Sequence, residues 1–524
     1  MKLSVRAGLA GVAAAAVALG LAEIVAVLTG PLSSPLLAVG GVVVDTVPGP
    51  VKDAAIALFG RHDKTALITG TVILLALYAA AVGVAALRSW SLALAGVVLF
   101  TGIGTGAALS RHDAGFTAAL PSIVAGIAAT VALRYLISLA VAASPAETKA
   151  LVTVGGEDGA LAETRATTPF PDDSRRRFLI GVGVAGGIAA AGGVAGRLLT
   201  SRRAVSVARE AVVLPPPVAS APTVPAGAQV QGATAYVTSN ADFYRIDTAL
   251  YTPRVDPATW QLRIHGMVRN PITLTWEQVL RRPMVSRYVT LACVSNEVGG
   301  DLIGNALWLG IPVKELLDEA QPLPDADQVV SRSADGWTCG TPTAVLRDGR
   351  DALLAIGMNG EPLPVAHGFP ARMVVPGLYG YVSACKWITE IELTRFADFD
   401  AYWVPRGWSA LGPVKTQSRI DTPRDGATRK PGPVTIAGVA WAQHRGITRV
   451  EVQVDGDPWQ EARLAPAVSA DTWVQWSHQW QASPGKHTIR VRATDRDGVT
   501  QTSTPASPVP DGATGWHSIR VSID

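Results

Sequence analysis

The chain reads HGFPARMVVPG at residues 367–377. This stretch places His367 five residues before Arg372, in a proline-rich segment that continues as a short apolar run. The guanidinium of Arg372 is a rigid fork that can bind an oxyanion through two hydrogen bonds, and the ring of His367 can donate another. Both side chains could also merely brace a turn. The neighbouring motifs therefore decide how this one is interpreted.

Three further patterns stand in order around this stretch. MNGEPLP occupies residues 358–364 upstream, and Lys386-Trp387 follows downstream. Further upstream, the alternating run YVTLAC at residues 288–293 ends in Cys293, and a polar turn follows it. A thiolate at this position could bind a soft, high-valent metal. Taken alone, a single cysteine after an apolar strand is more often a small buried residue.

The order of these motifs resembles the molybdopterin domain of sulfite oxidases and their bacterial relatives. The resemblance covers about residues 236–400, and the segment after 413 is similar to the immunoglobulin-like dimerisation domain of that family. It implies a molybdenum-molybdopterin cofactor, in which a pterin dithiolene and the sulfur of Cys293 hold the metal. Cys293 would then be the direct metal ligand and a catalytic residue. Arg372 and His367 would bind the pterin, with His367 as a donor.

The resemblance also implies roles for residues whose amino-acid type alone indicates no particular function. Tyr402 and Arg406 are expected on the catalytic, substrate-facing side, because the family's fold returns the chain to the mouth of the pocket there. Cys339 and the side chain of Cys385 are interpreted as small buried residues. Tyr244 and Arg245 could equally form a surface turn. The further expected cofactor contacts are Asn240, Tyr244, Arg245, Ser333, Asp335, Ala384, Cys385 and Lys386.

The turn after the cysteine departs from the family pattern. Sulfite oxidases carry arginines there that hold the substrate anion, whereas Val294 to Gly300 contain none. Glu297 near the metal would repel sulfite unless Arg406 or another cation compensates for its charge. The expected reaction is therefore a two-electron oxygen-atom transfer on a small substrate, either sulfite oxidation or sulfoxide reduction. The alternative from another class is a non-catalytic, membrane-anchored binding or assembly protein on a degenerate sulfite oxidase fold. A thiol hydrolase using Cys293 and His367 lacks a third orienting residue.

Composition separates the chain into an apolar and a soluble half. Of its 524 residues 48% are hydrophobic and 17% charged, and the apolar excess lies in roughly the first 200 residues, which indicates a membrane region. The net charge of +3 without a basic, aromatic stripe argues against nucleic-acid binding. The three cysteines form no CxxC pair, so neither a zinc site nor a disulfide framework is indicated.

Four apolar runs have the length of membrane spans, and they lie at about 7–29, 65–87, 91–109 and 115–141. The stretch at 35–59 is interrupted by Asp45 and Pro48-Gly49-Pro50, and we expect it not to cross. A fifth run, at about 178–199, follows Arg175 to Arg177. This pattern resembles a twin-arginine export signal, although it could be an ordinary positive-inside cluster. Both interpretations place the chain after about residue 200 outside the cytoplasmic membrane.

The expected fold is a helical membrane bundle, then an α+β molybdopterin domain, then an immunoglobulin-like β-sandwich. We find no histidine pair for haem within the spans and no CxxCH motif, so electrons must pass through an external carrier, a cytochrome or a quinone-linked protein. A homodimer would suit the last domain. The expected segments are a transmembrane region at 1–145, a cytoplasmic linker at 146–174, the signal and fifth span at 175–200, a Pro/Ala-rich spacer at 201–235, the molybdopterin domain at 236–412, and the immunoglobulin-like domain at 413–524.

Overall fold

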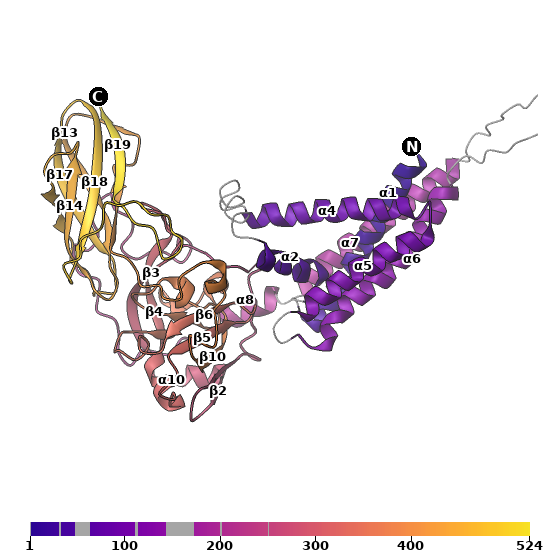
Figure 1. Ribbon diagram of the computed structural model, residues 1–524, viewed down its shortest axis with the longest axis horizontal. Helices are drawn as coiled ribbons and strands as arrows, with labels where there is room; N and C mark the ends of the chain where they lie inside the picture. Colours follow the sequence, from indigo (N-terminus) through magenta and orange to yellow (C-terminus); the bar gives the residue numbers. More distant parts are fainter. Residues whose placement is uncertain are drawn as a thin grey trace, which may run out of the picture. The chain divides into compact units, whose positions relative to one another are not determined.

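The computed structural model describes residues 2–30, 33–47, 63–110, 114–142, 172–199, 202–249 and 251–524, which divide into two compact units. The helical unit comprises the first part of the chain and the second unit begins at Ala204, as Figure 1 shows in ribbon form. The Pro48-Gly49-Pro50 break and most of the predicted cytoplasmic linker lie outside the described residues.

The first unit consists of helices. They are α1 (Leu3–Thr29), α2 (Pro35–Thr46), α4 (Asp63–Ala85), α5 (Trp90–Leu109), the 3-10 turn η3 (Phe116–Ala119), α6 (Leu120–Ala142) and α7 (Asp172–Leu199). Helix α1 packs against α4, α6 and α7. Within the described ranges, four helices are long and apolar enough to cross a membrane, and they match the predicted runs: Leu3–Thr29, Ala66–Ala85, Trp90–Leu109 and Phe116–Ala142.

The described parts of the two remaining predicted segments are helical or nearly so, with α2 ending at Thr46. Helix α2 has 12 residues, a length of ~18 Å that falls short of a ~30 Å hydrocarbon core. The described part of the 35–59 stretch is therefore too short to span. Residues 178–199 lie within α7, and whether this helix crosses a membrane stays a prediction.

The second unit begins with an α+β domain built on two sheets. One sheet has the order β2-β1-β10-β5-β6, with β1 and β10 parallel and the other pairs antiparallel. Two short helices, α9 (Trp276–Leu280) and α10 (Val313–Ala320), accompany it. The strands are β1 (Gln261–Gly266), β2 (Ile272–Thr275), β5 (Gln328–Ser333), β6 (Thr338–Pro342) and β10 (Ile388–Thr394).

The second sheet of this domain carries the sequence motifs. Its order is β3-β4-β7-β8, and β9 pairs with β7. Cys293 directly follows β3, the MNG turn joins β7 to β8, and Arg372 opens β9. The elements are β3 (Val285–Ala292), β4 (Ile303–Pro312), β7 (Leu353–Met358), β8 (Glu361–Pro362), β9 (Arg372–Val374), and the 3-10 turns η4 (Val365–His367), η5 (Gly380–Val382) and η6 (Val404–Arg406).

The carboxy-terminal domain is a β-sandwich, as predicted. One sheet has the order β11-β13-β17-β16 and the other β12-β19-β18-β14-β15. Apolar side chains from both sheets, among them Ile436, Trp476 and Ile489, form one buried core. The strands are β11 (Gln417–Thr422), β12 (Ala427–Arg429), β13 (Gly432–Trp441), β14 (Ile447–Val454), β15 (Gln460–Glu461), β16 (Arg463–Leu464), β17 (Val474–Ala482), β18 (Gly485–Asp495) and β19 (His517–Ile523).

The stretch predicted as a spacer, residues 201–235, is part of the folded unit. It starts with α8 (Arg202–Glu210) and then runs along the edge of β3, where Ser286 N donates to Ala219 O at 3.0 Å. Further on, Val230 N donates to Gln475 Oε1 of the β-sandwich at 2.6 Å. The edge strand supplies backbone partners that proline-rich composition does not reveal. This corrects the prediction of a free linker.

Candidate active site

Cys293 lies at the start of a closed turn. Its backbone N donates to Leu302 O at 2.9 Å, and Asn296 N donates back to Cys293 O at 3.1 Å. The side chain of Asn296 closes the turn further, because its Oδ1 accepts from Leu302 N at 2.8 Å. The position of the thiol is therefore set by the backbone on both sides of it.

The thiol of Cys293 is partly buried. Burial raises its pKa, while hydrogen bonds from Ser295 and the positive charge of Lys386 act in the opposite direction. A metal binds the thiolate and displaces the proton, so these neighbours favour the form that a metal requires.

His367 ends η4 with its side chain only 5% exposed. Its Nε2 lies 3.0 Å from Asn240 O, a pure acceptor, so Nε2 carries the proton and donates. Phe243 meets the ring edge-on at 5.7 Å. Burial, with the charge of Arg372, lowers the pKa of His367 to about 4. The ring is therefore neutral at pH 7 with its Nε2 proton directed to Asn240 O, and donation from His367 to the pterin stays a prediction.

Arg372 is a buried cation, 5% exposed. Its Nη1 donates to His367 O at 3.1 Å, and its guanidinium lies 5.0 Å from the centroid of the Trp308 ring. Burial lowers the pKa of Arg372 to about 10, so it stays charged at neutral pH. In the described part of the chain no carboxylate forms an ion pair with it. A buried charge without a partner costs several kcal/mol, roughly, so the site is suited to an anion.

Lys386 and Arg245 share one carboxylate. Asp247 Oδ2 accepts from Lys386 Nζ at 2.7 Å and from Arg245 Nε at 2.9 Å. Burial lowers the pKa of Lys386 to about 8, and Asp247 opposes this shift. Two cations against one anion leave this group with one net positive charge, in addition to that of Arg372. Sequence reasoning missed Asp247, although an acidic residue two positions after Arg245 was a usable signal.

The other predicted cofactor contacts, around Lys386 and around Ser333, lie in adjoining segments. Met373 N donates to Cys385 O at 2.8 Å, which joins the segment of Ala384, Cys385 and Lys386 to β9. Ala334 N donates to Trp387 O at 2.9 Å and brings the β5–β6 turn alongside. The side chains of that turn form hydrogen bonds within the turn itself. Ser333 Oγ accepts from Asp335 N at 3.5 Å, and Asp335 Oδ1 accepts from Trp337 N at 3.2 Å.

Asn240 and Tyr244 belong to the segment that contacts His367 through Asn240 O and the ring of Phe243. The side chain of Asn240 holds the MNG turn, since its Oδ1 accepts from Asn359 Nδ2 at 2.8 Å. The ring of Tyr244 stacks on Phe243 at 5.2 Å. Burial raises the pKa of Tyr244 far above its usual range, and Cys293 and Arg372 lie close enough to influence it. Tyr244 thus lies near Cys293 and Arg372, and its contact with the cofactor stays a prediction.

The two predicted substrate-side residues contact each other. The guanidinium of Arg406 lies 3.7 Å from the Tyr402 ring centroid, and its Nη1 donates to Tyr402 O at 2.5 Å. Their substrate role stays a prediction. Glu297 is exposed, while Cys339 and Cys385 are fully buried as expected.

The arrangement fits a large anionic cofactor with a soft metal. Arg372 lacks a counter-ion, and Asn296 Nδ2 is a buried donor without a partner among the described atoms. Both are unfavourable in a site that binds nothing, and both are satisfied by oxyanion or carbonyl acceptors. Cys293 provides the sulfur that a soft metal prefers.

Comparisons with known proteins agree with this fit. Residues 249–403 match the family model described as oxidoreductase molybdopterin binding domain, and residues 417–491 match that of a bacterial Ig domain. A Bacillus subtilis (strain 168) protein, named "Uncharacterized oxidoreductase YuiH", is 32% identical over 159 residues, which are 30% of this chain and 76% of that protein. The chain belongs to the molybdopterin-binding oxidoreductase family. The predicted enzyme class and molybdenum cofactor are thereby confirmed.

This oxidoreductase also resembles proteins with named activities. The mitochondrial sulfite oxidase of Macaca fascicularis is 29% identical over 341 residues, 55% of this chain and 62% of that protein. The nitrate reductase [NADPH] of Emericella nidulans is 29% identical over 259 residues, 40% of this chain and 29% of that protein. The chain thus spans less than two thirds of the length of either relative.

Proposed function

We propose that this oxidoreductase transfers an oxygen atom to or from a small substrate, outside the cytoplasmic membrane, at a molybdenum held by Cys293. When bound, the cofactor supplies a centre that exchanges two electrons and one oxygen atom with the substrate. The observation that carries the proposal is the buried, uncompensated guanidinium of Arg372 in the same site as the strand-end Cys293. Sulfite oxidation and sulfoxide reduction are the two candidate directions.

The residues around the site would act on the cofactor by binding and orienting it. Arg372 would offer a charged donor to an oxyanion of the cofactor, and neutral His367, whose Nε2 faces Asn240 O, would offer Nδ1 as an acceptor. Lys386 and Arg245 neutralise Asp247 and add one net positive charge. This positive charge favours an anionic substrate, although the turn after Cys293 contains no arginine. The side chain of Glu297 is exposed to solvent, which weakens its repulsion of such an anion.

Membrane attachment is the second part of the proposal. Four apolar helices of spanning length support a multi-pass anchor. The cluster Arg175 to Arg177 would remain in the cytoplasm and place the catalytic domain on the other side. Electrons would then pass to or from an external carrier, a cytochrome or a quinone-linked protein.

The test is metal and pterin analysis of the full chain purified in detergent. We expect molybdenum and a fluorescent pterin on acid release from the wild type, and a reduced but measurable molybdenum content in Cys293→Ser. Cys339→Ser is the matched control, because it makes the same atomic change at a buried cysteine that binds no cofactor in the proposal. Absence of both metal and pterin from the wild type would support a binding or assembly protein instead.

Direction is settled by a substrate screen on the same preparation. Sulfite with an artificial electron acceptor tests oxidation, and a sulfoxide with an artificial donor tests reduction. Turnover of one pair and its loss in Cys293→Ser supports oxygen-atom transfer in that direction. A wild type that contains the cofactor but turns over neither pair contradicts the proposed substrate class.

A further inference from the structure

Thr290, three residues before Cys293, is held by the β-sandwich domain. Its N donates to Asp471 O at 2.9 Å, and its O accepts from Gln443 Nε2 at 3.0 Å. Its Oγ1 accepts from Trp473 N at 2.9 Å. Loops of the β-sandwich domain therefore satisfy the edge of β3 at Thr290, whereas nearer the start of the strand the segment around Ala219 pairs with it.

These contacts are shielded from water. Thr290, Gln443 and Trp473 are each 1% exposed. The Nε1 of Trp473 also donates to Tyr236 O at 2.9 Å, so the same loop holds the segment around Tyr236 as well as β3. Buried hydrogen bonds of this kind are costly to break, because the groups left behind have no water to replace their partner.

A second contact holds the far end of the cysteine turn. Arg419 Nη1, from β11, donates to Gly300 O at 2.8 Å, while its Nε pairs with Asp421 Oδ1 at 2.6 Å. Gly299 lies directly against His517, because a Cβ added there would come within 2.3 Å of its ring Cδ2. Gly299 also has a φ of +79°, so a side chain is disfavoured on both grounds.

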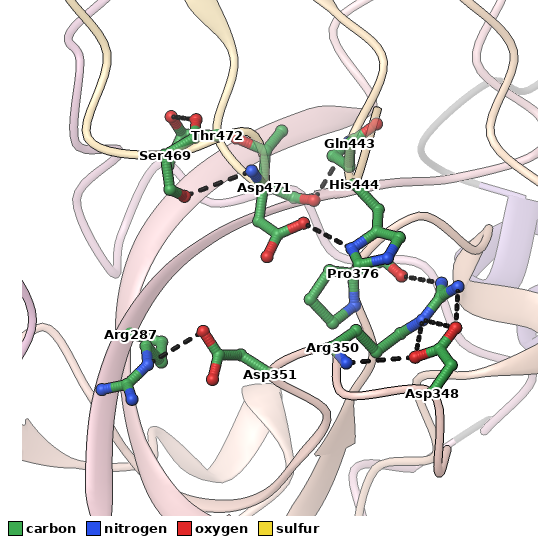
Figure 2. Close-up of polar contacts among 11 residues, drawn as sticks. Arg287, Asp348, Arg350, Asp351, Pro376, Gln443, His444, Ser469, Asp471 and Thr472 are labelled. Atoms are coloured by element: carbon green, nitrogen blue, oxygen red, sulfur yellow. Dashed lines mark hydrogen bonds and ion pairs between the residues drawn. The ribbon is translucent and has the colours of Figure 1, made fainter. Parts of the chain in front are cut away.

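The loops that make the first contact are themselves fixed. Figure 2 shows His444 beside Asp471, at 3.5 Å, and Ser469 Oγ accepting from Asp471 N at 3.2 Å. The same view shows Arg350, whose Nη1 donates to Pro376 O at 2.7 Å. A Cβ added at Gly377 would lie 3.2 Å from Gln443 O, so the end of the HGFPARMVVPG stretch packs directly under this loop.

We infer that the carboxy-terminal β-sandwich is a positioning element for Cys293, holding the chain at Thr290 and at Gly300 on either side of the thiol. The inference rests on the proposed ligand role of Cys293. A domain that served only to dimerise would need no buried contacts with this turn. Residues more than 100 positions downstream thereby orient the sulfur relative to the cofactor.

Two variants test the two contacts separately. Gln443→Leu removes the donor to Thr290 O, and Arg419→Gln removes the donor to Gly300 O. The matched controls are Gln501→Leu and Arg492→Gln, which remove a buried amide and a paired guanidinium inside the same domain. Gln501 donates to Gly515 O and accepts from Ser418 Oγ, and Arg492 pairs with Glu451, so neither side chain hydrogen-bonds to the described residues 290–300.

Three measurements are made on each full-length protein: the electron paramagnetic resonance spectrum of Mo(V), the molybdenum retained against a chelator, and the thermal unfolding midpoint. We expect Gln443→Leu and Arg419→Gln to shift the Mo(V) g-values and to lower molybdenum affinity about tenfold, as changes around metal ligands commonly do. The controls should lower the unfolding midpoint while leaving the spectrum as in the wild type.

The outcomes separate the two claims. A wild-type spectrum in both Gln443→Leu and Arg419→Gln overturns the positioning role while leaving the proposed function intact. Equal spectral shifts in the controls overturn it as well, since general destabilisation then accounts for the effect. A wild type without molybdenum refutes the proposed function itself. If Gln443→Leu does not fold, Arg419→Gln, at an 11% exposed side chain, decides the question alone.

Discussion

Arg372 is the residue that most constrains what the site binds. Its surroundings are carbonyl oxygens and the Trp308 ring, which stabilise a cation only partly. Arg372 is therefore expected to lower the stability of the cofactor-free protein and to raise that of the protein with cofactor bound. A side chain that only stabilises the fold would not have opposite effects on the two forms.

Replacing Arg372 by methionine tests this expectation. Arg372→Met keeps much of the side-chain volume but removes the buried charge, so it should raise the unfolding midpoint of cofactor-free protein. It should also lower cofactor retention by about ten- to a hundredfold, the equivalent of a charge-assisted hydrogen bond of about 1.5–3 kcal/mol. Calorimetry and pterin analysis measure the two effects. A variant that is less stable when empty and retains the cofactor contradicts this interpretation.

His367 predicts a pH dependence of stability. Its pKa of about 4 in the folded protein lies below its ordinary value of 6.5. Between pH 6.5 and 4 the unfolded chain takes up a proton that the folded chain does not, so the free energy of unfolding falls as the pH falls, by up to about 3 kcal/mol in total. Urea titrations should show this fall in the wild type and a smaller one in His367→Gln. Equal slopes would show that His367 is protonated in the folded state.

At the scale of elements, α8 connects the start of the second unit to the turn before His367. Arg209, on the last turn of α8, donates from Nε to Leu363 O at 2.8 Å and from Nη2 to Pro362 O at 2.6 Å. It also pairs with Glu361 at 2.9 Å. The helix is too short and too polar to be stable alone, so this anchor keeps it in place.

Removing the anchor should release the helix. Arg209→Ala loses hydrogen bonds of about 1–3 kcal/mol, and we expect faster amide hydrogen exchange across residues 204–211. Arg281→Ala is the control, because that side chain is exposed and, among the described residues, its ion pair is with Glu277 one turn away. Unchanged exchange in α8 after the Arg209 substitution would mean that Val205, buried in the core, holds the helix without it.

Several elements were predictable because their signals are local. The alternating sequence RVEVQV at 449–454 lies in β14, HTIRVRA at 487–493 lies in β18, and WEQVL at 276–280 forms α9. Helix α9 begins with a capping box, in which Thr275 and Gln278 satisfy each other's backbone N–H groups. The prediction of a spacer at 201–235 was wrong because the conformation of this segment depends on hydrogen bonds to the edge of β3, which is distant in the sequence, and not on its own composition.

The site divides in the same manner. Cys293, His367 and Arg372 stand in short motifs, and the structure brings their segments together. The hydrogen-bond partner of His367 Nε2 could not be predicted, because Asn240 lies 127 positions away in the sequence. Gln443 and Arg419 carry no local signal at all, since each is an ordinary polar residue until its long-range carbonyl partner is known.

At the scale of the whole molecule, the account requires export across a membrane. The two interpretations of Arg175 to Arg177 differ in one testable respect. Arg175→Lys with Arg176→Lys keeps the positive charge, so a positive-inside cluster would tolerate it. A twin-arginine signal is read by a receptor and should fail, leaving residues after 200 protected from externally added protease in intact, wall-free cells. Unchanged protease access would rule out the export-signal interpretation.

Molybdenum bound through Cys293 is the claim on which the rest depends, and X-ray absorption at the molybdenum edge tests it most directly. The wild type should show sulfur neighbours from the pterin dithiolene together with one from cysteine. Cys293→Ser, loaded with cofactor to a measurable level, should show one sulfur neighbour fewer, while Cys339→Ser should match the wild type. An unchanged sulfur shell in Cys293→Ser, or a wild type without molybdenum, would contradict the account.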